Sequence, residues 1–269
     1  MADLSIIIPA RNEPYLQKTV EDILDHIEGD TEVLVGLDYG ENYKPELEAV
    51  RDMRVRYWIG NVNGEGQRRM MNILVGISNA KYILKVDGHC SFSQGFDVEM
   101  IKAMDDKTIM SPYMLKLDAE NWTVLPQQPT SMYVFDTDLV MQHWRDGATQ
   151  DLIEETMCPS GAAFMVTREN YWKWNLCDES LGSWGGQVTE LGIKAYLNGG
   201  RCVTNKNCFF GHLFREKKDD FPYDRGEHPG QFALEELRKR YKNKSIAGLI
   251  EKFNYPAGWS KELVDNLPE

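Results

Sequence analysis

The chain has 269 residues, of which 42% are hydrophobic and 11% aromatic, and it carries a formal net charge of −12. It is long enough for one large α/β domain or two small ones with a substantial core, and no apolar run approaches the length of a membrane span. Its five cysteines are odd in number and lack C-x-x-C spacing, which argues against a disulfide framework and against a structural zinc site.

Charge is unevenly distributed along the chain. Residues 1–50 contain 12 acidic and 3 basic residues, whereas residues 201–252 contain 12 basic and 8 acidic residues. The C-terminal third could present a basic face to a polyanion, although such a run is more often a solvated helix face. The basic residues of the C-terminal third are Arg215, Lys217, Lys218, Arg225, Arg238, Lys239, Arg240, Lys242 and Lys244.

The start of the chain, Met1–Leu4, has neither a basic leader nor a long apolar region, so we expect a cytoplasmic protein with no membrane partner.

The first third of the chain alternates predicted strands and helices. Residues 4–9 form an apolar run rich in β-branched residues, and Pro14 opens a helical pattern that continues to a C-cap at Gly29. A second apolar run at residues 32–38 again ends on an acid, which completes a right-handed β-α-β unit. The alternation continues with a strand, a helix and a strand at residues 55–59, 66–80 and 82–86.

The remainder of the chain is less regular. Residues 118–157 are rich in loop signals and scattered aromatics, and we assign no regular structure to them. From residue 231 the chain is helical in character, with Ser245 as the expected N-cap of a helix at residues 246–253 and a loose tail after it. The other predicted elements are a helix at 96–104, strands at 109–117 and 159–166, a helix at 188–198, and strands at 201–204 and 207–212.

The stretch Tyr82–Cys90 places two possible metal ligands at the end of a predicted strand. Its apolar run stops at Asp87, Gly88 and His89, which would lie at the carboxyl end of a buried strand. Ligands bind beyond such strand ends in open α/β sheets, so this pair is a candidate for holding a metal or a nucleotide. An ordinary Asp-Gly turn is the alternative, and His212, which ends another predicted strand, favours the metal.

Taken in order, these motifs resemble the nucleotide-sugar-dependent glycosyltransferases of the GT-A fold, most closely the polypeptide N-acetylgalactosaminyltransferases and the family-2 enzymes. The resemblance spans roughly residues 4–223 and rests on five stations with comparable spacing. They are the first strand and nucleotide loop (SIIIPARNE, Ser5–Glu13), the second strand (Glu32–Asp38), the Asp-x-His motif (in Lys85–Cys90), the Trp-Gly-Gly motif (Trp184–Gly186) and the Gly-His-x-Phe-Arg motif (Gly211–Arg215).

The resemblance implies an α/β fold of the GT-A class, Rossmann-like, with a mainly parallel central sheet flanked by helices. It implies a single catalytic domain at residues 1–225, followed by a helical C-terminal extension at residues 226–269. It also implies a UDP-sugar as the donor substrate and a divalent metal as the cofactor.

The same resemblance assigns roles to individual residues. A divalent metal would be held by Asp87, His89 and His212, and one carboxylate with two imidazoles, completed by phosphate oxygens and water, suits Mn²⁺ or Mg²⁺. Such an ion would neutralise the charge that develops on the leaving diphosphate. For Arg69, a plain salt bridge is an equal alternative to a nucleotide contact. The residues implied to contact the nucleotide or its diphosphate are Pro9, Arg11, Glu13, Asp38, Arg69, Arg215 and Tyr223.

One departure from the family pattern affects the acceptor side. After Trp-Gly-Gly the family usually has Glu-Asn, whereas this chain has Gln187 and Val188. Glu190 lies one helical turn further on and could supply a carboxylate near the acceptor, the alternative being an exposed helix carboxylate. The general base and the stereochemistry stay open, with retention favoured by analogy because a retaining enzyme can use the leaving diphosphate as its base. The candidate catalytic residues are Asp87, Trp184, Gln187 and Glu190.

The predicted function is metal-dependent transfer of a hexosyl or N-acetylhexosaminyl group from a UDP-sugar to an acceptor hydroxyl. The compact layout also resembles short bacteriophage-encoded glycosyltransferases, so a hydroxymethylated base in phage DNA, in the cytoplasm of an infected cell, is one expected acceptor. The net charge argues against DNA, and protein, glycan and lipid acceptors are alternatives. A sugar nucleotidyltransferase is an alternative reaction class, although the loop Ala10–Glu13 lacks the glycines of its phosphate loop. A nucleotide-sugar-binding protein without turnover is the non-enzymatic alternative.

Overall fold

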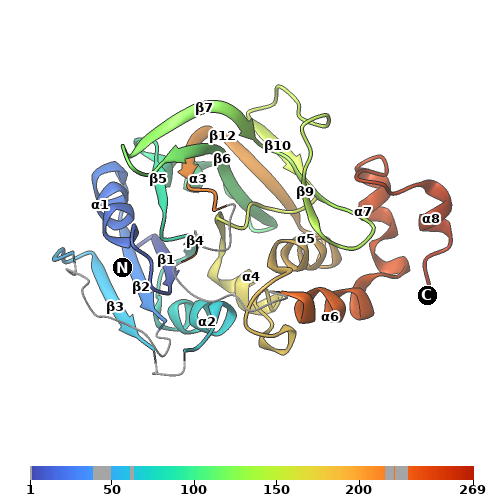
Figure 1. The fold of residues 1–269 in the computed structure, drawn as a ribbon, viewed down its shortest axis with the longest axis horizontal. Coiled ribbons are helices and arrows are strands. Elements are labelled where there is room, and N and C mark those ends of the chain that lie inside the picture. The colour runs from blue at the N-terminus through green and yellow to red at the C-terminus, as the bar shows by residue number, and fades with distance from the viewer. Residues whose placement is uncertain (1, 39–49, 61–63, 216–220, 222–229) are drawn as a thin grey trace.

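The computed structural model describes residues 2–38, 50–60, 64–215, 221 and 230–269. These residues form a mixed β-sheet with helices on both of its faces (Figure 1). The strand-helix alternation expected for an α/β protein is therefore confirmed.

The N-terminal part alternates strands and helices as predicted. Ile6 and Ile8 of the first strand pack into the hydrophobic cluster that includes the first helix, and Ile7 packs into the cluster that includes the second. A strand covered on both faces has no solvated side, which is why its sequence is a continuous apolar run. The first helix ends with Ile27 as its C-cap, not at the expected Gly29. The elements are β1 (Leu4–Ala10), α1 (Leu16–His26), β2 (Thr31–Leu37), β3 (Val55–Ile59), α2 (Gln67–Ile77) and β4 (Tyr82–Val86).

Residues 118–157, to which the sequence assigned no regular structure, contain several short strands. Two of them form a separate hairpin in which Tyr133 lies opposite His143. Short strands of this kind are stabilised by their pairing partners, and their own sequence carries little periodicity. The strands of this part are β7 (Thr123–Thr130), β8 (Tyr133–Phe135), β9 (Met141–His143) and β10 (Ile153–Thr156), and the elements between β4 and it are β5 (Cys90–Phe92), α3 (Phe96–Ala103) and β6 (Thr108–Asp118).

The two strands predicted near residues 201–204 and 207–212 are one strand, β12 (Arg201–His212). Its register against β6 shifts between Asn205 and Phe209, which marks a β-bulge. The Asn205 side chain accepts a hydrogen bond from the backbone N–H of Asn207 at 2.9 Å, so the bulge has the local bonding of a turn. This bonding explains why the sequence there indicated a break between two strands.

The remaining elements before β12 are β11 (Ala163–Thr167), α4 (Arg168–Lys173), the 3₁₀ turn η1 (Glu179–Leu181) and α5 (Gln187–Leu197). The strand order of the main sheet is β10-β12-β6-β11-β4-β1-β2-β3. Neighbours β4, β1, β2 and β3 run parallel, as do β6 and β12, whereas β11 is antiparallel to both of its neighbours. The carboxyl ends of β1, β2 and β4 consequently meet at one edge of the sheet, where ligands bind in folds of this kind.

The C-terminal part is more ordered than predicted. Asn243, not Ser245, caps the short turn before α7, because the Asn243 side chain accepts the backbone N–H of Ser245. The prediction of a loose C-terminal tail is also wrong, because Val264 and Leu267 are buried. The elements are α6 (Gln231–Tyr241), the 3₁₀ turn η3 (Lys244–Ile246), α7 (Ala247–Lys252) and α8 (Lys261–Asp265), and Figure 1 shows α6, α7 and α8 grouped at one end of the molecule.

The C-terminal helices share a hydrophobic core with the rest of the chain. One buried cluster joins Leu237 of α6 and Ile250 of α7 to Ile193 of α5 and to Phe135 of β8. Trp259 adds a hydrogen bond from its indole N–H to the carbonyl of Phe135 at 3.1 Å. The division into a catalytic domain at 1–225 and an extension at 226–269 stays a prediction, and the extension packs directly on α5.

Candidate functional site

A cavity of about 950 Å³ opens at the carboxyl edge of the sheet. Loops after β1, β2 and β4 supply one end of it, and the segment before α5, the β8–β9 hairpin and the start of α6 supply the other. The predicted site residues that line it are Pro9, Arg11, Glu13, Asp38, Asp87, His89, Trp184, Gln187, His212 and Arg215. The tertiary structure thus gathers in one place side chains that are spread over some two hundred positions of the sequence.

Asp38 organises the end of the cavity next to β1 and β2. Its carboxylate accepts the backbone N–H groups of Glu65 and Gly66 at the start of α2. It also accepts a hydrogen bond from Arg11 Nη2 at 2.6 Å. These contacts join the loops that follow β1 and β2 to the helix α2.

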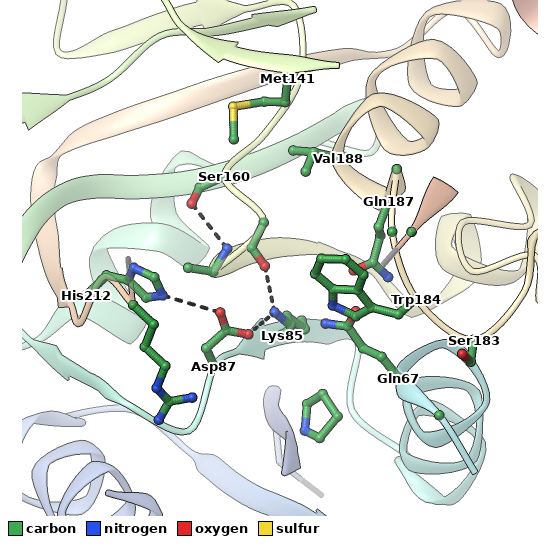
Figure 2. A pocket seen from close by; sticks show the side chains of 18 of the residues that line it. Gln67, Lys85, Asp87, Met141, Ser160, Ser183, Trp184, Gln187, Val188 and His212 are labelled. Atoms are coloured by element: carbon green, nitrogen blue, oxygen red, sulfur yellow. Dashed lines mark hydrogen bonds and ion pairs between the residues drawn. The ribbon is translucent and has the colours of Figure 1, made fainter. Parts of the chain in front are cut away.

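Asp87, His89 and His212 form a compact cluster of possible metal ligands. One ligand atom from each residue lies within 4.8 Å of the other two. Asp87 and His89 follow β4, and His212 is brought beside them because the end of β12 pairs with β5 at Cys90. Figure 2 shows the Asp87 carboxylate between the His212 ring on one side and Lys85 on the other.

The local charges set the protonation of this cluster. Burial raises the pKa of Asp87, but the Lys85 ammonium and the two imidazoles hold that pKa well below its usual range. Burial lowers the pKa of His212, and the nearby Asp87 carboxylate only partly opposes this effect. An ionised carboxylate and a neutral imidazole are the forms that bind a metal ion.

The cluster fits a divalent metal by an observation independent of its residue types. Both ring nitrogens of His212 are buried and make no hydrogen bond to the described residues. Asp87 Oδ2 lies 3.4 Å from His212 Nε2. Buried polar atoms normally have partners, so an imidazole aimed at a carboxylate and a second imidazole, without a hydrogen bond, is suited to a cation between them.

Lys85 is a site residue that the motifs did not single out. Its side chain is 1% exposed, and its ammonium group contacts Asp87 Oδ1 and donates to the Gly161 carbonyl at 2.6 Å. The sequence did contain a signal, because a lysine inside an apolar, fully buried strand needs a specific partner.

Glu13 lies beside the metal cluster in the loop after β1. Its carboxylate contacts His89 Nδ1 at 2.9 Å and Arg215 Nη2 at 2.7 and 2.8 Å. Burial raises the pKa of Glu13, but the hydrogen bonds and charges of His89 and Arg215 lower it overall. Arg215, implied by sequence to contact a diphosphate, is therefore paired with a carboxylate in this structure.

Arg69 and Glu190 are not brought to the cavity. The Arg69 side chain is 59% exposed and pairs with Glu65 at 2.7 Å, which is the salt-bridge alternative. Glu190 was expected either at the acceptor or exposed on its helix, and it is completely buried. Its carboxylate binds Arg68 at 3.0 Å and Lys194 at 2.5 Å.

Arg68, the neighbour of Arg69, is the buried arginine of α2. It lies on the inward face of the helix with Met71 and Val75, at the helical spacing that the sequence already contains. Its Nη2 also donates to the Gly185 carbonyl at 2.7 Å, in the loop that carries Trp184. The spacing within α2 was thus the signal that could have distinguished Arg68 from Arg69.

The loop before α5 packs closely against the start of α6. Gly185 and Gly186 have φ angles of +99° and +61°, which disfavour any residue with a Cβ. A Cβ on Gly185 would lie 2.3 Å from the Gly230 Cα, and one on Gly182 would lie 3.0 Å from the Phe232 ring. The C-terminal helices therefore contribute to the wall of the cavity next to Trp184.

The other end of the cavity is neutral in its described part. Figure 2 shows Met141, Ser160, Val188 and Gln187 around this end. The Gln187 side chain donates to the sulfur of Cys177 at 2.9 Å, which holds the amide against the core. Further side chains that sequence reasoning did not include are Tyr133, Leu139 and His143. Burial, with the charge of Arg145, lowers the pKa of His143.

The remaining sequence predictions concern the C-terminal third. The structure does not describe one expected nucleotide contact, Tyr223, or three of the basic residues, Lys217, Lys218 and Arg225. The described basic side chains bind carboxylates or carbonyl groups of the chain itself: Arg215 to Glu13, Arg238 to the Asp138 carbonyl, Lys239 to Glu236, Arg240 to Asp178, Lys242 to Asp138, and Lys244 to the carbonyls of Val264 and Asp265. None of the helices in the described ranges is long and apolar enough to cross a membrane.

Comparison with protein families and known sequences gives consistent matches. The family model "Glycosyl transferase family 2" matches residues 5–174. A Drosophila melanogaster protein named "Putative polypeptide N-acetylgalactosaminyltransferase 13" is 25% identical over 258 residues, covering 86% of this chain and 45% of that protein. Human polypeptide N-acetylgalactosaminyltransferase 10 is 23% identical over 238 residues, covering 80% and 38%. This chain thus spans less than half the length of these two relatives.

Two solved structures share the fold. GalNAc-T7, crystallised with UDP, GalNAc and Mn²⁺, superimposes with a TM-score of 0.76 at 17% identity, over 100% of this chain and 55% of that one. S. aureus TarS superimposes with a TM-score of 0.56 at 15% identity, over 96% of this chain and 44% of that one. At these identities the likeness concerns the fold, and it confirms the GT-A architecture expected from the sequence.

Proposed function

Because this chain belongs to glycosyl transferase family 2, we propose that it transfers a sugar from a UDP-sugar donor to an acceptor hydroxyl with the help of a divalent metal. The observation that carries the proposal is the cluster of Asp87, His89 and His212, which shares one cavity with Asp38. The three possible metal ligands and Asp38 lie at the same edge of the sheet. One donor molecule could therefore place its nucleoside beside Asp38 and its diphosphate beside the metal.

The nucleotide would bind between Arg11, Asp38 and the start of α2. Asp38 fixes the backbone of Glu65 and Gly66, so the loop that would surround the base and ribose is held before the ligand arrives. Carboxylate oxygens accept hydrogen bonds from ribose hydroxyls and from the N–H of a pyrimidine ring. Pro9 and Arg11 line the same end of the cavity.

Charge balance supports a metal as part of the donor site. The carboxylates of Asp87 and Glu13 are offset by Lys85 and Arg215, which leaves the protein side of the site close to neutral. Asp87, His89 and His212 would hold Mn²⁺ or Mg²⁺, which would supply the positive charge that neutralises the leaving diphosphate. GalNAc-T7, which shares the fold, was crystallised with UDP and Mn²⁺.

We propose a retaining mechanism because the described carboxylates that line the cavity are all paired with cations. Among the described lining residues the carboxylates are Glu13, Asp38 and Asp87, and each is paired with a cation. Glu190 is held in the interior by Arg68 and Lys194. A retaining transferase can remove the acceptor proton with an oxygen of the leaving diphosphate, and so needs no such carboxylate.

A neutral acceptor hydroxyl suits the described part of the cavity better than a polyanion. The acceptor end is lined by neutral side chains such as Met141 and Gln187. The described basic side chains of the C-terminal third already bind partners within the chain, so they give no support to the phage DNA acceptor expected as one option. Protein, glycan and lipid hydroxyls remain the proposed acceptor classes.

The experiment is a donor screen with purified protein. We expect a panel of UDP-sugars with Mn²⁺ to raise the melting temperature, and mass spectrometry to detect slow hydrolysis of the donor that is bound. Asp87→Ala should lose both effects, because the metal cluster loses its carboxylate. If no UDP-sugar binds, or if Asp87→Ala behaves like the wild type, the proposed function is wrong.

A further inference from the structure

We propose that Glu13 is a positioning residue that orients the metal ligand His89 and holds Arg215 beside the metal cluster. The proposal rests on the proposed function, since it concerns how the Asp87, His89 and His212 cluster is prepared for its cation. Glu13 was expected from the resemblance to contact the nucleotide, and its contacts assign it a different role.

Both oxygens of the Glu13 carboxylate are already engaged by the protein. Oε2 lies 2.9 Å from His89 Nδ1 and 2.8 Å from Arg215 Nη2. Oε1 accepts from the same Nη2 at 2.7 Å and from the backbone N–H of Tyr15 at 3.2 Å. The Glu13 and Arg215 side chains are each 6% exposed, so these contacts are made away from solvent.

The backbone around Gly88 provides the space for this carboxylate. A Cβ on Gly88 would lie 2.8 Å from Cγ of Glu13, which is closer than two carbon atoms approach. Gly88 sits between the ligands Asp87 and His89, so the absence of a side chain there lets Glu13 reach His89. The glycine of the motif is thus explained by the passage of the Glu13 side chain.

The contact to His89 determines which ring nitrogen can bind a metal. A carboxylate that accepts from Nδ1 fixes the neutral imidazole in the tautomer with its proton on Nδ1. The lone pair is then on Nε2, and the ring cannot rotate without losing this part-buried hydrogen bond. Carboxylate partners of this kind orient metal-bound histidines, and removing them weakens metal affinity by about 10- to 100-fold.

The contact between Glu13 and Arg215 brings the segment after β12 to the metal cluster, beside the loops that follow β1 and β4. Arg215 follows the ligand His212 at the end of β12, and the Leu213 backbone N–H donates to the His89 carbonyl at 3.2 Å. The contact of Nη2 with both oxygens of Glu13 therefore holds the guanidinium next to the cluster before any anion is bound.

The test measures Mn²⁺ binding without nucleotide, by titration calorimetry and by the electron paramagnetic resonance signal of free Mn²⁺. We expect Glu13→Gln to weaken Mn²⁺ affinity about tenfold or more, because a neutral amide oxygen accepts the His89 N–H less strongly than an ionised carboxylate does. Gly88→Ala keeps every charge but displaces Glu13, and it should weaken Mn²⁺ affinity in the same direction. Glu21→Gln, on the exposed side of α1, is the matched control and should bind Mn²⁺ like the wild type.

Arg215→Met separates the two contacts of Glu13. It leaves the His89 contact in place, so Mn²⁺ affinity should stay within about threefold of the wild type, while affinity for UDP with Mn²⁺ falls. If Arg215→Met weakens Mn²⁺ binding as much as Glu13→Gln does, the loss in Glu13→Gln reflects disorder of the Arg215 segment, and the proposed orientation of His89 is wrong.

A measurement on the wild type does not depend on any variant folding. Long-range ¹H–¹⁵N correlation spectra of the metal-free protein at alkaline pH distinguish the two imidazole tautomers, and the chain has only five histidines. We expect His89, assigned through His89→Gln, to carry its proton on Nδ1. A proton on Nε2 would overturn the proposal.

The outcomes also separate this inference from the proposed function. If the wild type binds Mn²⁺ and UDP but Glu13→Gln binds Mn²⁺ equally well, the inference fails and the proposed function stands. If the wild type binds neither, both fail.

Discussion

Arg68 and Glu190 form an ion pair in the interior, with Nη2 of the arginine 3.0 Å from Oε2 of the glutamate and both side chains excluded from solvent. The other carboxylate oxygen lies 2.5 Å from Lys194 Nζ. Arg68 also binds the Gly185 carbonyl, so one buried network connects α2, α5 and the loop that carries Trp184. Glu190 consequently supports a wall of the cavity and does not line it.

Glu190→Ala should destabilise the fold severely. The substitution leaves Arg68 and Lys194 buried without their carboxylate, and breaking a buried pair in this way costs about 3–5 kcal/mol. Urea unfolding followed by circular dichroism measures the change in the free energy of unfolding. Glu169→Ala, at an exposed position of α4, should change it by less than about 0.5 kcal/mol. A Glu190→Ala protein of wild-type stability without turnover would instead return Glu190 to the role of acceptor-side carboxylate.

Asp38→Asn should weaken the binding of UDP while leaving the protein folded. The amide cannot accept both backbone N–H groups and the Arg11 contact, and hydrogen bonds to a charged group contribute about 1.5–3 kcal/mol. We therefore expect the dissociation constant for UDP with Mn²⁺ to rise by about 10- to 100-fold, as measured by calorimetry. Glu32→Gln, on β2 itself and paired with Arg56, is the control. Equal UDP affinity for the two variants would show that Asp38 has no part in nucleotide binding.

The stability of the metal-free protein should depend on pH through His212. Its pKa in the folded state is lowered by burial, so between that pKa and the ordinary value of about 6.5 the unfolded chain binds more protons than the folded one. Its contribution to stability is therefore full above about pH 6.5 and declines as the pH falls through the folded pKa. Urea unfolding in the presence of a chelator, repeated across this pH range, gives the free energy of unfolding as a function of pH. This free energy should change less steeply with pH in His212→Asn than in the wild type. The pKa of His143 is lowered in both proteins, so an unchanged pH dependence in His212→Asn would contradict the assignment to His212.

The C-terminal helices should be required for the stability of the whole chain. Ile250 of α7 is fully buried in the cluster that also contains Ile193 and Phe135, so Ile250→Ala should cost about 2–5 kcal/mol in a single cooperative transition. Leu263 is 48% exposed, and Leu263→Ala removes a similar side chain at little cost. Two separate unfolding transitions for Ile250→Ala would indicate that the C-terminal part is an independent unit.

Much of the site was predictable because it lies at the ends of strands. Asp38 and Asp87 directly follow apolar runs, and parallel strands place their carboxyl ends at one edge of a sheet. His212 was identifiable from its motif, and the pairing of β12 with β5 brings it to His89. The resemblance implied a nucleotide contact for Arg69, but Arg69 is exposed, and the arginine on the inward face of α2 is Arg68.

The sequence by itself determined the alternation of strands and helices in the first third of the chain, the presence of a carboxylate and histidine pair at one strand end, and the family of the chain. These features depend on local periodicity and on residues close together in the sequence. Only the tertiary structure decided that Glu190 is buried by Arg68, that Glu13 binds both His89 and Arg215, and that the last helices complete the core. Each of these contacts joins residues brought together by the packing of separate elements. A side chain's partners, and hence its role, follow from that packing, which local sequence patterns do not specify.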